Sequence, residues 1–586
     1  MARRELVRCD AHDLAYDPSI HDGCTLCRKS RVPPPALPPR ASEALKTAAM
    51  VCVMALWVAF VLGGAYAMKT RLLAMSKSRS KTPAGPLAKM PDAPRPRDFV
   101  RVPVQPPTEL PFIKRPGTDP FGYPRDAVDK LGLLALLGAG RYETLTAYLE
   151  QLEHDSESDF HKEIWVADAF ESFATADPNV DTAIEDWVSA SPGSFAPLLS
   201  RATHRISLAW YYRGHEFLNK TDGDRKAKFD EIMRTVDPDI ELALQLEPKL
   251  VYARQLRLEI DGGGVTKLAK RKALDEALSI CPACFRVRSF YLSRLAPRWG
   301  GSYAAMDQFA LDAQKDAAKN PLLKALLGYA DDDRCLAYLH DEKYAAALEA
   351  CDHAIAAADY QRFQFSRMYA LKDMKRFDEA LAAVERAAEL APLNDEYLAW
   401  RGRLRITAGR LSEGTQDLRT ALALDPTSEK NGPVVDSSIA LLIRASYDRS
   451  QTNDFQGSLD ALNLALLLSP GNQDALSRKA FAERRIADEK VAAPLERAAL
   501  SADADFDAVK KLDDELVKTG QFPRIVKAWD EYIAAHPDDA RAYLERGGAR
   551  LHAGDTDGAL SDLLRSCNAG LQRGCEGVQF VRARMH

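Results

Sequence analysis

The stretch 397-YLAWRGRLRITAGRLSEGTQDLRTALALDP-426 decides the fold of this chain. Its pattern is helical, and no alternating strand pattern competes with it. In a frame of about 34 residues, it carries small residues, a leucine and a proline at positions 8, 15, 24, 27 and 32: Gly402, Gly409, Leu418, Ala421 and Pro426. Small side chains at positions 8 and 20 let two antiparallel helices approach closely, position 24 fills the space between them, and proline at position 32 stops the second helix. The stretch therefore predicts one tight helical hairpin.

The same frame recurs along the C-terminal half of the chain. The preceding unit, 368–392, has four residues in register: Ala380, Val384, Ala387 and Pro392. The last unit, 542–566, has five: Tyr543, Gly547, Gly554, Ala559 and Leu563. Other units begin near residues 328, 439 and 506, a degenerate one begins near 473, and the spacing is irregular between 428 and 439. Self-similarity at a fixed period is typical of a repeat array, so these units predict stacked helix pairs.

This frame resembles that of the tetratricopeptide repeat (TPR) family over residues 328–573. Known members are mostly non-catalytic and bind peptides or partner proteins along a concave face. The resemblance implies an all-α fold, an α-solenoid of TPR-like helical hairpins over residues 328–586. It also implies a scaffold that binds protein or peptide partners through a helical-repeat groove, without covalent chemistry.

The region 126–320 is helical too but lacks this frame. It resembles an uncharacterised bacterial domain family, domain of unknown function 4034, in the following residues: Trp187, Pro192, Ser194, Trp210, Arg213, Gly214 and the box Pro297-Arg298-Trp299-Gly300-Gly301-Ser302. Within the box, Pro297 and the two glycines should break a helix, and Ser302 should cap the next one.

Four residues of this region suggest an alternative function, an enzyme of unknown reaction. Trp210 and Trp299 could line a pocket with Arg213 and Arg298. The opposing interpretation is that both tryptophans belong to the core and that the arginines pair with carboxylates. Clustering of all four around a cleft would favour catalysis, whereas an open concave face would favour recruitment. The sequence contains no phosphate-binding loop, dinucleotide fingerprint, HExxH motif or GxSxG motif.

Six cysteines after residue 280 form three pairs at plausible spacing. Cys335 and Cys351 take positions 8 and 24 of one hairpin, so they should face each other. Cys281 and Cys284 form a C-P-A-C motif, for which a redox role is the alternative. Cys567 and Cys575 are spaced as in Sel1-like helical repeats, a resemblance that implies a bridge between two helices. Three disulfides would indicate an oxidising compartment; six independent buried thiols are the other interpretation.

The N-terminal tail, residues 1–32, contains four residues with the spacing of a zinc site: Cys9, His12, Cys24 and Cys27. Two-residue gaps let each pair turn toward one ion, and thiolate and imidazole suit tetrahedral zinc. A tail this short cannot build a core, so the metal would supply the folding free energy. The segment resembles zinc-ribbon-like knuckles of some bacterial membrane proteins, and four protein ligands imply a structural site. The alternative is a disordered tail with idle thiols.

Residues 47–68, TAAMVCVMALWVAFVLGGAYAM, contain no charge. As a helix they would span ~33 Å, enough for a bilayer core of ~30 Å. A signal peptide would carry its positive end near residue 1, so we expect a single transmembrane helix. The flanks carry five and six basic residues, which does not decide the orientation. Thiolate ligation of zinc favours a reducing compartment for the tail.

These observations predict a single-pass protein of the bacterial inner membrane, with a cytoplasmic N-terminus and a periplasmic C-terminal region; a cytoplasmic C-terminal region is the alternative. Residues 69–125 are rich in proline and basic residues and are expected to be an extended spacer. The net charge of −5 and pI of about 6.2 give no basic field for nucleic acid. The expected partners are therefore proteins and the membrane, with structural zinc as the cofactor.

Overall fold

The computed structural model describes residues 7–8, 15–16, 94–108, 112–214, 221–260 and 267–585. The chain divides into two units, Met1–Thr82 and Pro83–His586. In the first unit, β1 (Val7–Arg8) pairs antiparallel with β2 (Ala15–Tyr16). The predicted zinc ligands Cys9, His12, Cys24 and Cys27 lie outside the described residues, as do the predicted transmembrane segment 47–68 and residues 69–93 of the expected spacer. Within the described ranges, no helix is both long and apolar enough to cross a bilayer.

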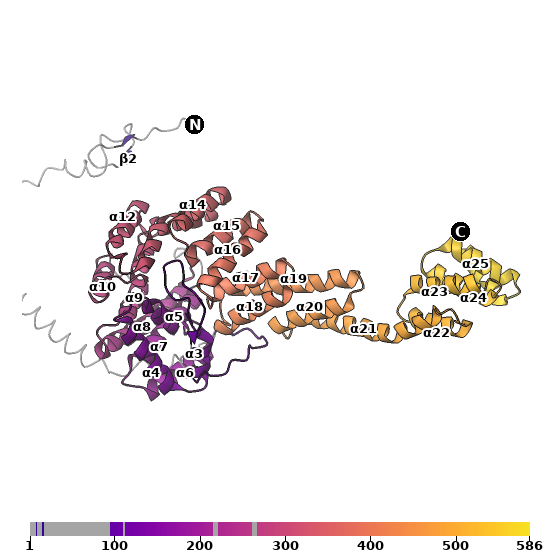
Figure 1. Ribbon diagram of the computed structural model, residues 1–586, viewed down its shortest axis with the longest axis horizontal. Helices are drawn as coiled ribbons and strands as arrows, with labels where there is room; N and C mark the ends of the chain where they lie inside the picture. The colour runs from indigo at the N-terminus through magenta and orange to yellow at the C-terminus, as the bar shows by residue number, and fades with distance from the viewer. Residues whose placement is uncertain are drawn as a thin grey trace, which may run out of the picture. The chain divides into compact units, whose positions relative to one another are not determined.

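The second unit is helical, which confirms the all-α prediction for the part of it that the structure describes (Figure 1). Two short strands of two residues each, β3 (Phe112–Ile113) and β4 (Ala127–Val128), pair antiparallel and precede the helices. The first half contains α3 (Lys130–Gly138), α4 (Tyr142–Ser156), α5 (Lys162–Glu171), α6 (Pro178–Ala190), α7 (Phe195–Arg213), α8 (Gly223–Leu246), α9 (Val251–Glu259), α10 (Lys267–Ile280), α11 (Arg286–Arg294) and α12 (Tyr303–Ala313), with short 3-10 helices η1 (Pro297–Trp299), η2 (Gln314–Asp316) and η3 (Pro321–Gly328).

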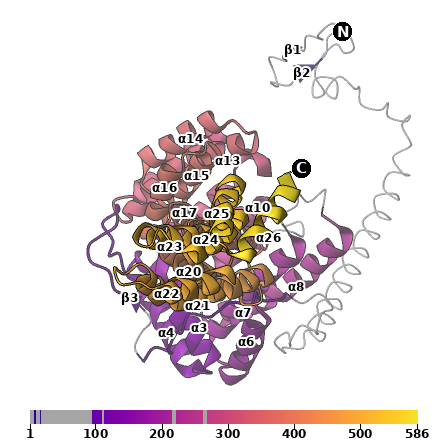
Figure 2. The same ribbon diagram turned by 90° about the vertical axis from the view of Figure 1, so that its right-hand side faces the viewer.

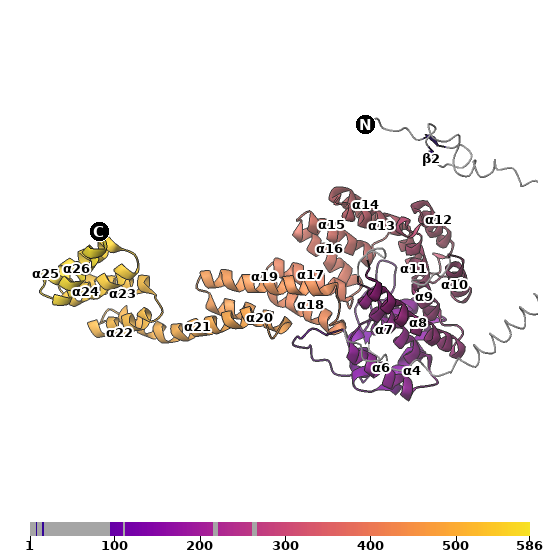
Figure 3. The same cartoon turned by 180° about the vertical axis from the view of Figure 1, so that it is seen from behind.

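The second half continues with α13 (Tyr329–His340), α14 (Tyr344–Ala357), α15 (Gln361–Asp373), α16 (Phe377–Leu390), α17 (Asp395–Thr407), α18 (Leu411–Leu424), α19 (Asn431–Gln451), α20 (Phe455–Leu468), α21 (Gln473–Ala499), α22 (Phe506–Val517), α23 (Phe522–Ala535), α24 (Ala540–His552), α25 (Thr556–Asn568) and α26 (Gln572–Met585). Consecutive helices pack in pairs, as α14, α15 and α16 do in Figure 2 and α17 to α20 do in Figure 3. This arrangement confirms the predicted solenoid of TPR-like hairpins.

The hairpins close where the sequence places its small residues. A Cβ added to Gly402 in α17 would lie 2.6 Å from the Gly414 carbonyl oxygen and 2.9 Å from Leu418 Cγ in α18. In α24, a Cβ on Gly547 would lie 3.0 Å from Leu563 Cγ of α25. Positions 8, 20 and 24 of the frame therefore meet between the two helices, as expected.

The three cysteine pairs are disulfide-bonded. Cys335 in α13 is joined to Cys351 in α14, with Cα atoms 5.3 Å apart. Cys281 is joined to Cys284 between α10 and α11, and Cys567 to Cys575 between α25 and α26. The Cys567–Cys575 bond matches the bridge that the Sel1-like spacing implies.

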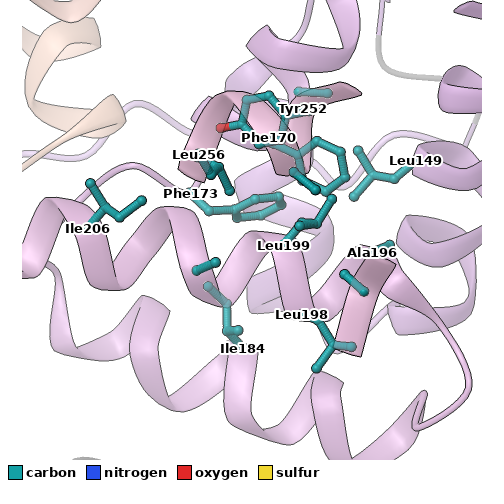
Figure 4. Close-up of a cluster of buried hydrophobic side chains, with 14 of the residues drawn as sticks. Leu149, Phe170, Phe173, Ile184, Ala196, Leu198, Leu199, Ile206, Tyr252 and Leu256 are labelled. Atoms are coloured by element: carbon teal, nitrogen blue, oxygen red, sulfur yellow. The ribbon is translucent and has the colours of Figure 1, made fainter. Parts of the chain in front are cut away.

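The helices α3 to α9 share one hydrophobic core. Phe170, Phe173, Ile184 and Leu199 are buried in it, and Phe170 stacks on Tyr252 at 5.0 Å between ring centroids (Figure 4). Trp187, one of the residues that carry the resemblance to the uncharacterised family, is fully buried in this core as well. The break after α11 lies where the sequence predicts it, because η1 is followed by Gly300 at φ 76°. Ser302 Oγ then accepts the Ala305 N–H at 3.1 Å and caps α12.

The expected boundary between 320 and 328 does not separate two cores. Phe285 and Leu292 of the first half lie in one hydrophobic cluster with Leu326, Tyr329 and Phe363. Side chains on both sides of the boundary therefore bury each other, and Pro83–His586 is a single compact unit. The reason is that η3, which bridges the two regions, packs against both α12 and α14.

The described part of the expected spacer also differs from a free linker. Phe99 is buried against the α17–α20 core, and the Arg97 and Val100 N–H groups donate to the carbonyls of Pro426 (3.0 Å) and Leu467 (2.9 Å). Arg97 also pairs with Asp436 through two hydrogen bonds of 2.6 and 2.8 Å. This extended segment is held on the solenoid because the prolines prevent a helix while Phe99 and Arg97 find partners on it.

Candidate protein-binding groove

A groove of 660 Å³ lies among α5, α9, α11, α13, α15 and α17. Three of these, α13, α15 and α17, are the first helices of successive hairpins. Tyr329, Arg362 and Glu396 each take the second position of their repeat units and line the groove together. The repeat therefore presents the same face of each hairpin to one concave surface.

Aromatic rings make up much of the groove wall. Tyr329 and Tyr360 lie 6.3 Å apart between ring centroids. Phe365 contacts Tyr397 at 4.5 Å and Tyr369 at 5.0 Å. Because aromatic pairs at these distances hold one another in place, the groove offers fixed apolar surfaces rather than loose side chains.

The charged groups of the groove are mostly paired within the protein. Arg286 forms an ion pair with Glu171, and Lys130 lies 3.9 Å from Asp168. Arg362 Nε donates to Asp332 at 2.6 Å, beneath the groove. These pairs offset the cost of burying charge, so they leave few unpaired charges for a ligand.

A second set of polar contacts lies at the α17 end of the groove. The Tyr369 hydroxyl donates to Glu396 at 3.1 Å, and Lys430 lies 3.6 Å from the same carboxylate. The aromatic and polar residues of α15 and α17 are thus joined in one network.

Glu259 is a carboxyl group of the groove with a raised pKa. Burial, together with the nearby Glu171 carboxylate, raises the pKa of this carboxyl to about 7. Arg294, which lies over the Trp299 ring at 5.2 Å, opposes this effect. At neutral pH a substantial fraction of Glu259 is therefore protonated and can donate a hydrogen bond.

The four residues of the enzyme alternative do not share this groove. Trp299 lines it and is 51% exposed. Trp210 is 37% exposed at the end of α7, where Arg213 lies over its ring at 4.7 Å and Phe229 contacts it at 5.2 Å. Trp210 and Arg213 do not line the groove. The expectation that Trp210 and Trp299 are core residues is therefore wrong.

The interpretation of Arg298 as the partner of a carboxylate is confirmed, because it pairs with Asp333 at 2.5 Å. The groove aromatics were not singled out from the sequence. A signal was present: aromatic or long side chains recur at the second and ninth positions of the units that begin near 328 and 361. The face they share only becomes visible once the hairpins are stacked.

Metal-ligating side chains do not gather in the part of the chain that the structure describes, where no group of three or more His, Cys, Asp or Glu is arranged to hold an ion. His154 lies 3.9 Å from Glu157, and His161 lies 3.3 Å from Asp159. The predicted zinc ligands are not among the described residues.

Comparison with known proteins agrees with the repeat pattern. The tetratricopeptide repeat family matches residues 368–429 and 514–567, so the chain carries TPR repeats in both places. A search of curated proteins found no significant match.

Several solved structures are similar to the chain. The TPR domain of P58(IPK) is 14% identical, with 73% of this chain and 97% of that chain covered and a TM-score of 0.20. A tetratricopeptide repeat protein from Parabacteroides merdae is 15% identical, with 50% and 99% covered and a TM-score of 0.20. Yeast Tom70 is 12% identical, with 75% and 95% covered and a TM-score of 0.19. TM-scores of this size carry nothing further about arrangement or function.

Proposed function

We propose that the chain is a scaffold that binds an extended segment of a partner protein in the groove between α11, α13, α15 and α17. The observation that carries the proposal is the row of mutually packed aromatic rings on the first helices of successive hairpins. The neighbouring charges are largely paired internally, and Trp299, which is half exposed, is the most exposed aromatic side chain that lines the groove. Aromatic grooves of this kind suit extended, apolar or proline-containing segments.

The chain offers a matched pair of side chains for the test. Trp299 and Trp210 are both exposed tryptophans beneath an arginine, but only Trp299 lines the groove. A photo-crosslinking amino acid placed at either position in cells would capture whatever lies against it. The captured partner segment is then synthesised and titrated against the full-length chain and the variants Trp299→Ala and Trp210→Ala.

We expect crosslinks from position 299 and not from 210. We also expect the Trp299→Ala variant to bind the segment at least tenfold more weakly, with Trp210→Ala unchanged. Equal loss in both variants, or binding that neither variant alters, would show that the groove is not the binding surface.

We further propose that this scaffold is anchored by residues 47–68 in a bacterial inner membrane, with its C-terminal region in the periplasm. The support is the uncharged stretch itself and the three disulfides beyond it, which suit an oxidising compartment. Free thiols are blocked in intact cells, the protein is denatured and reduced, and the newly released thiols are labelled. New labelling of all six cysteines after residue 280 would support a periplasmic location. If none of the six is newly labelled, the result would support the cytoplasmic alternative.

The N-terminal tail is proposed to bind structural zinc through Cys9, His12, Cys24 and Cys27. The support is the ligand spacing alone. A peptide of residues 1–32 should bind one Zn²⁺ ion, and cobalt substitution should give the absorption of tetrahedral thiolate coordination. The Cys24→Ser variant should lose that spectrum, and an unchanged spectrum would contradict the ligand assignment.

A further inference from the structure

A second cavity, of 360 Å³, is bounded by α4, α5, α9 and the connection between α10 and α11. Gln255 and Arg286 line both this cavity and the groove. Its apolar walls come from Phe160, Val166, Val251 and the Cys281–Cys284 disulfide. The volume suits a small organic molecule rather than a peptide.

Two polar atoms of the residues that line this cavity make no hydrogen bond within the described part of the chain, Glu153 Oε2 and Arg286 Nε. Glu153, on α4, is 7% exposed, and its Oε2 atom makes no hydrogen bond to any residue that the structure describes. The Val251 N–H reaches the same carboxyl group. Buried carboxyl oxygens in folded proteins almost always have a partner, because a buried polar atom without a hydrogen bond destabilises the fold. The orphan oxygen therefore marks a place for a ligand.

The other charged groups around the cavity already have partners. Glu163 accepts the N–H groups of Phe285 and Arg286 at the start of α11, the second at 3.3 Å. Lys249 pairs with Glu157 at 2.7 Å.

Arg286 is likewise engaged, by Glu171. No cation among the described residues forms an ion pair with Glu153, and the carboxylates of Glu157 and Glu247 add to the negative potential around it.

We propose that this cavity binds a small organic amine, whose ammonium group donates to Glu153 Oε2 and whose apolar body contacts Phe160, Val166 and Val251. A neutral or anionic ligand of the same shape would leave the negative potential uncompensated. This proposal does not rest on the binding of a partner segment in the groove.

Burial raises the pKa of the Glu153 carboxyl to about 8, so the empty cavity holds this group largely protonated at pH 7. A bound ammonium ion favours the ionised carboxylate. Binding at pH 7 should therefore release close to one proton for each ligand bound.

The test is calorimetric titration of the full-length chain in detergent micelles, with phenethylamine as the probe and 2-phenylethanol as the neutral analogue. Measurement at pH 7 in two buffers of different ionisation enthalpy gives the number of protons released. We expect phenethylamine to bind at least tenfold more tightly than 2-phenylethanol, with release of nearly one proton.

Three variants locate the site. Glu153→Gln should weaken phenethylamine binding at least tenfold and abolish proton release, while Glu143→Gln, at an exposed position of α4 that does not line the cavity, should change the affinity less than threefold. Trp299→Ala, which alters the groove, should leave amine binding unchanged, so that failure here is distinct from failure of the proposed scaffold.

The proposal is overturned if the amine and the alcohol bind equally, if neither binds, or if Glu153→Gln binds like the natural chain. The comparison of the two probes and the proton count use the unaltered chain, so they decide the matter even if the variant folds poorly.

Discussion

Cys335 and Cys351 are bonded to each other at the two positions where Gly402 and Leu418 pack in the hairpin α17–α18. Both pairs take positions 8 and 24 of the repeat frame. In α22–α23 the same two positions hold Asp513 and Trp529, and the Trp529 indole N–H donates to the Asp513 carboxylate at 2.8 Å. At these two positions the helices of a hairpin are thus joined by a disulfide in α13–α14, by packing in α17–α18 and by a hydrogen bond in α22–α23.

Removal of the central disulfide should loosen one hairpin. Because a bond that closes a loop of 16 residues restricts the unfolded chain, Cys335→Ala with Cys351→Ala should lower the free energy of local unfolding by ~3 kcal/mol. Amide hydrogen exchange of α13 and α14 measures this loss. The control is Cys567→Ala with Cys575→Ala, which should affect α25 and α26 and leave α13 protected. Equal exchange from α13 in both double variants would contradict the assignment.

A single added methyl group should separate α17 from α18. In Gly402→Ala the new Cβ would meet the Gly414 carbonyl oxygen at 2.6 Å, and backbone cannot move away as a flexible side chain can. We expect a loss of ~1–3 kcal/mol in urea unfolding, as for other overpacked sites. Gly548→Ala is the matched control: Gly548 also lies within a helix, α24, but a Cβ there meets nothing within 4 Å. That variant should be neutral or more stable by ~0.5–1 kcal/mol.

These glycines illustrate what the sequence reveals. The frame around Gly402 and Leu418 predicts the hairpin because its spacing encodes contacts between neighbouring helices, which are local in the chain. The same is true of the Cys335–Cys351 pair and of the Ser302 cap. A repeated salt bridge was equally readable: Arg401 and Arg546 share position 7, and they pair with Asp417 and Asp562 at position 23.

The groove could not be predicted from local spacing in the sequence. Its wall combines Lys130, Glu259 and Tyr397, which are far apart in the sequence and belong to helices with and without the repeat frame. Their proximity depends on how successive hairpins are rotated, and no local spacing encodes that rotation. The packing of Phe99 on α17–α20 was missed for the same reason, since a proline-rich segment looks alike whether it is free or docked.

Two arginines buried between α7 and α8 depend on one carboxylate. Arg201 donates to Asp239 at 2.6 and 2.9 Å, and Arg205 lies 3.3 Å from it. Asp239→Asn removes one of the two carboxylates that form ion pairs with both guanidinium groups, the other being Glu185, so we expect a loss of ~3–5 kcal/mol in urea unfolding. Glu241 lies on the same helix as Asp239 and forms an exposed ion pair with Arg257 of α9. The Glu241→Gln variant breaks that pair and should cost less than ~1 kcal/mol. Similar losses in both variants would mean that burial does not set the value of this pair.

The stability of the chain should also depend on the protonation of Glu153. Burial, together with the carboxylates of Glu157 and Glu247, raises the pKa of this carboxyl to about 8. In the unfolded chain the same group titrates near its ordinary value of 4.5. Between these two values the folded protein binds more protons than the unfolded chain, so the free energy of unfolding must fall as the pH rises.

We therefore expect the Glu153→Gln variant to lose less stability than the natural chain between pH 5 and pH 8, by ~3 kcal/mol in urea unfolding. The amide cannot ionise, so the variant lacks this contribution to the pH dependence, while Glu163 and the other carboxyl groups still titrate. Glu143→Gln is the control and should retain the natural slope, because this exposed side chain of α4 does not line the cavity. If both variants follow the natural curve, Glu153 is ionised in the folded chain at neutral pH, and a cation or water already satisfies its free oxygen.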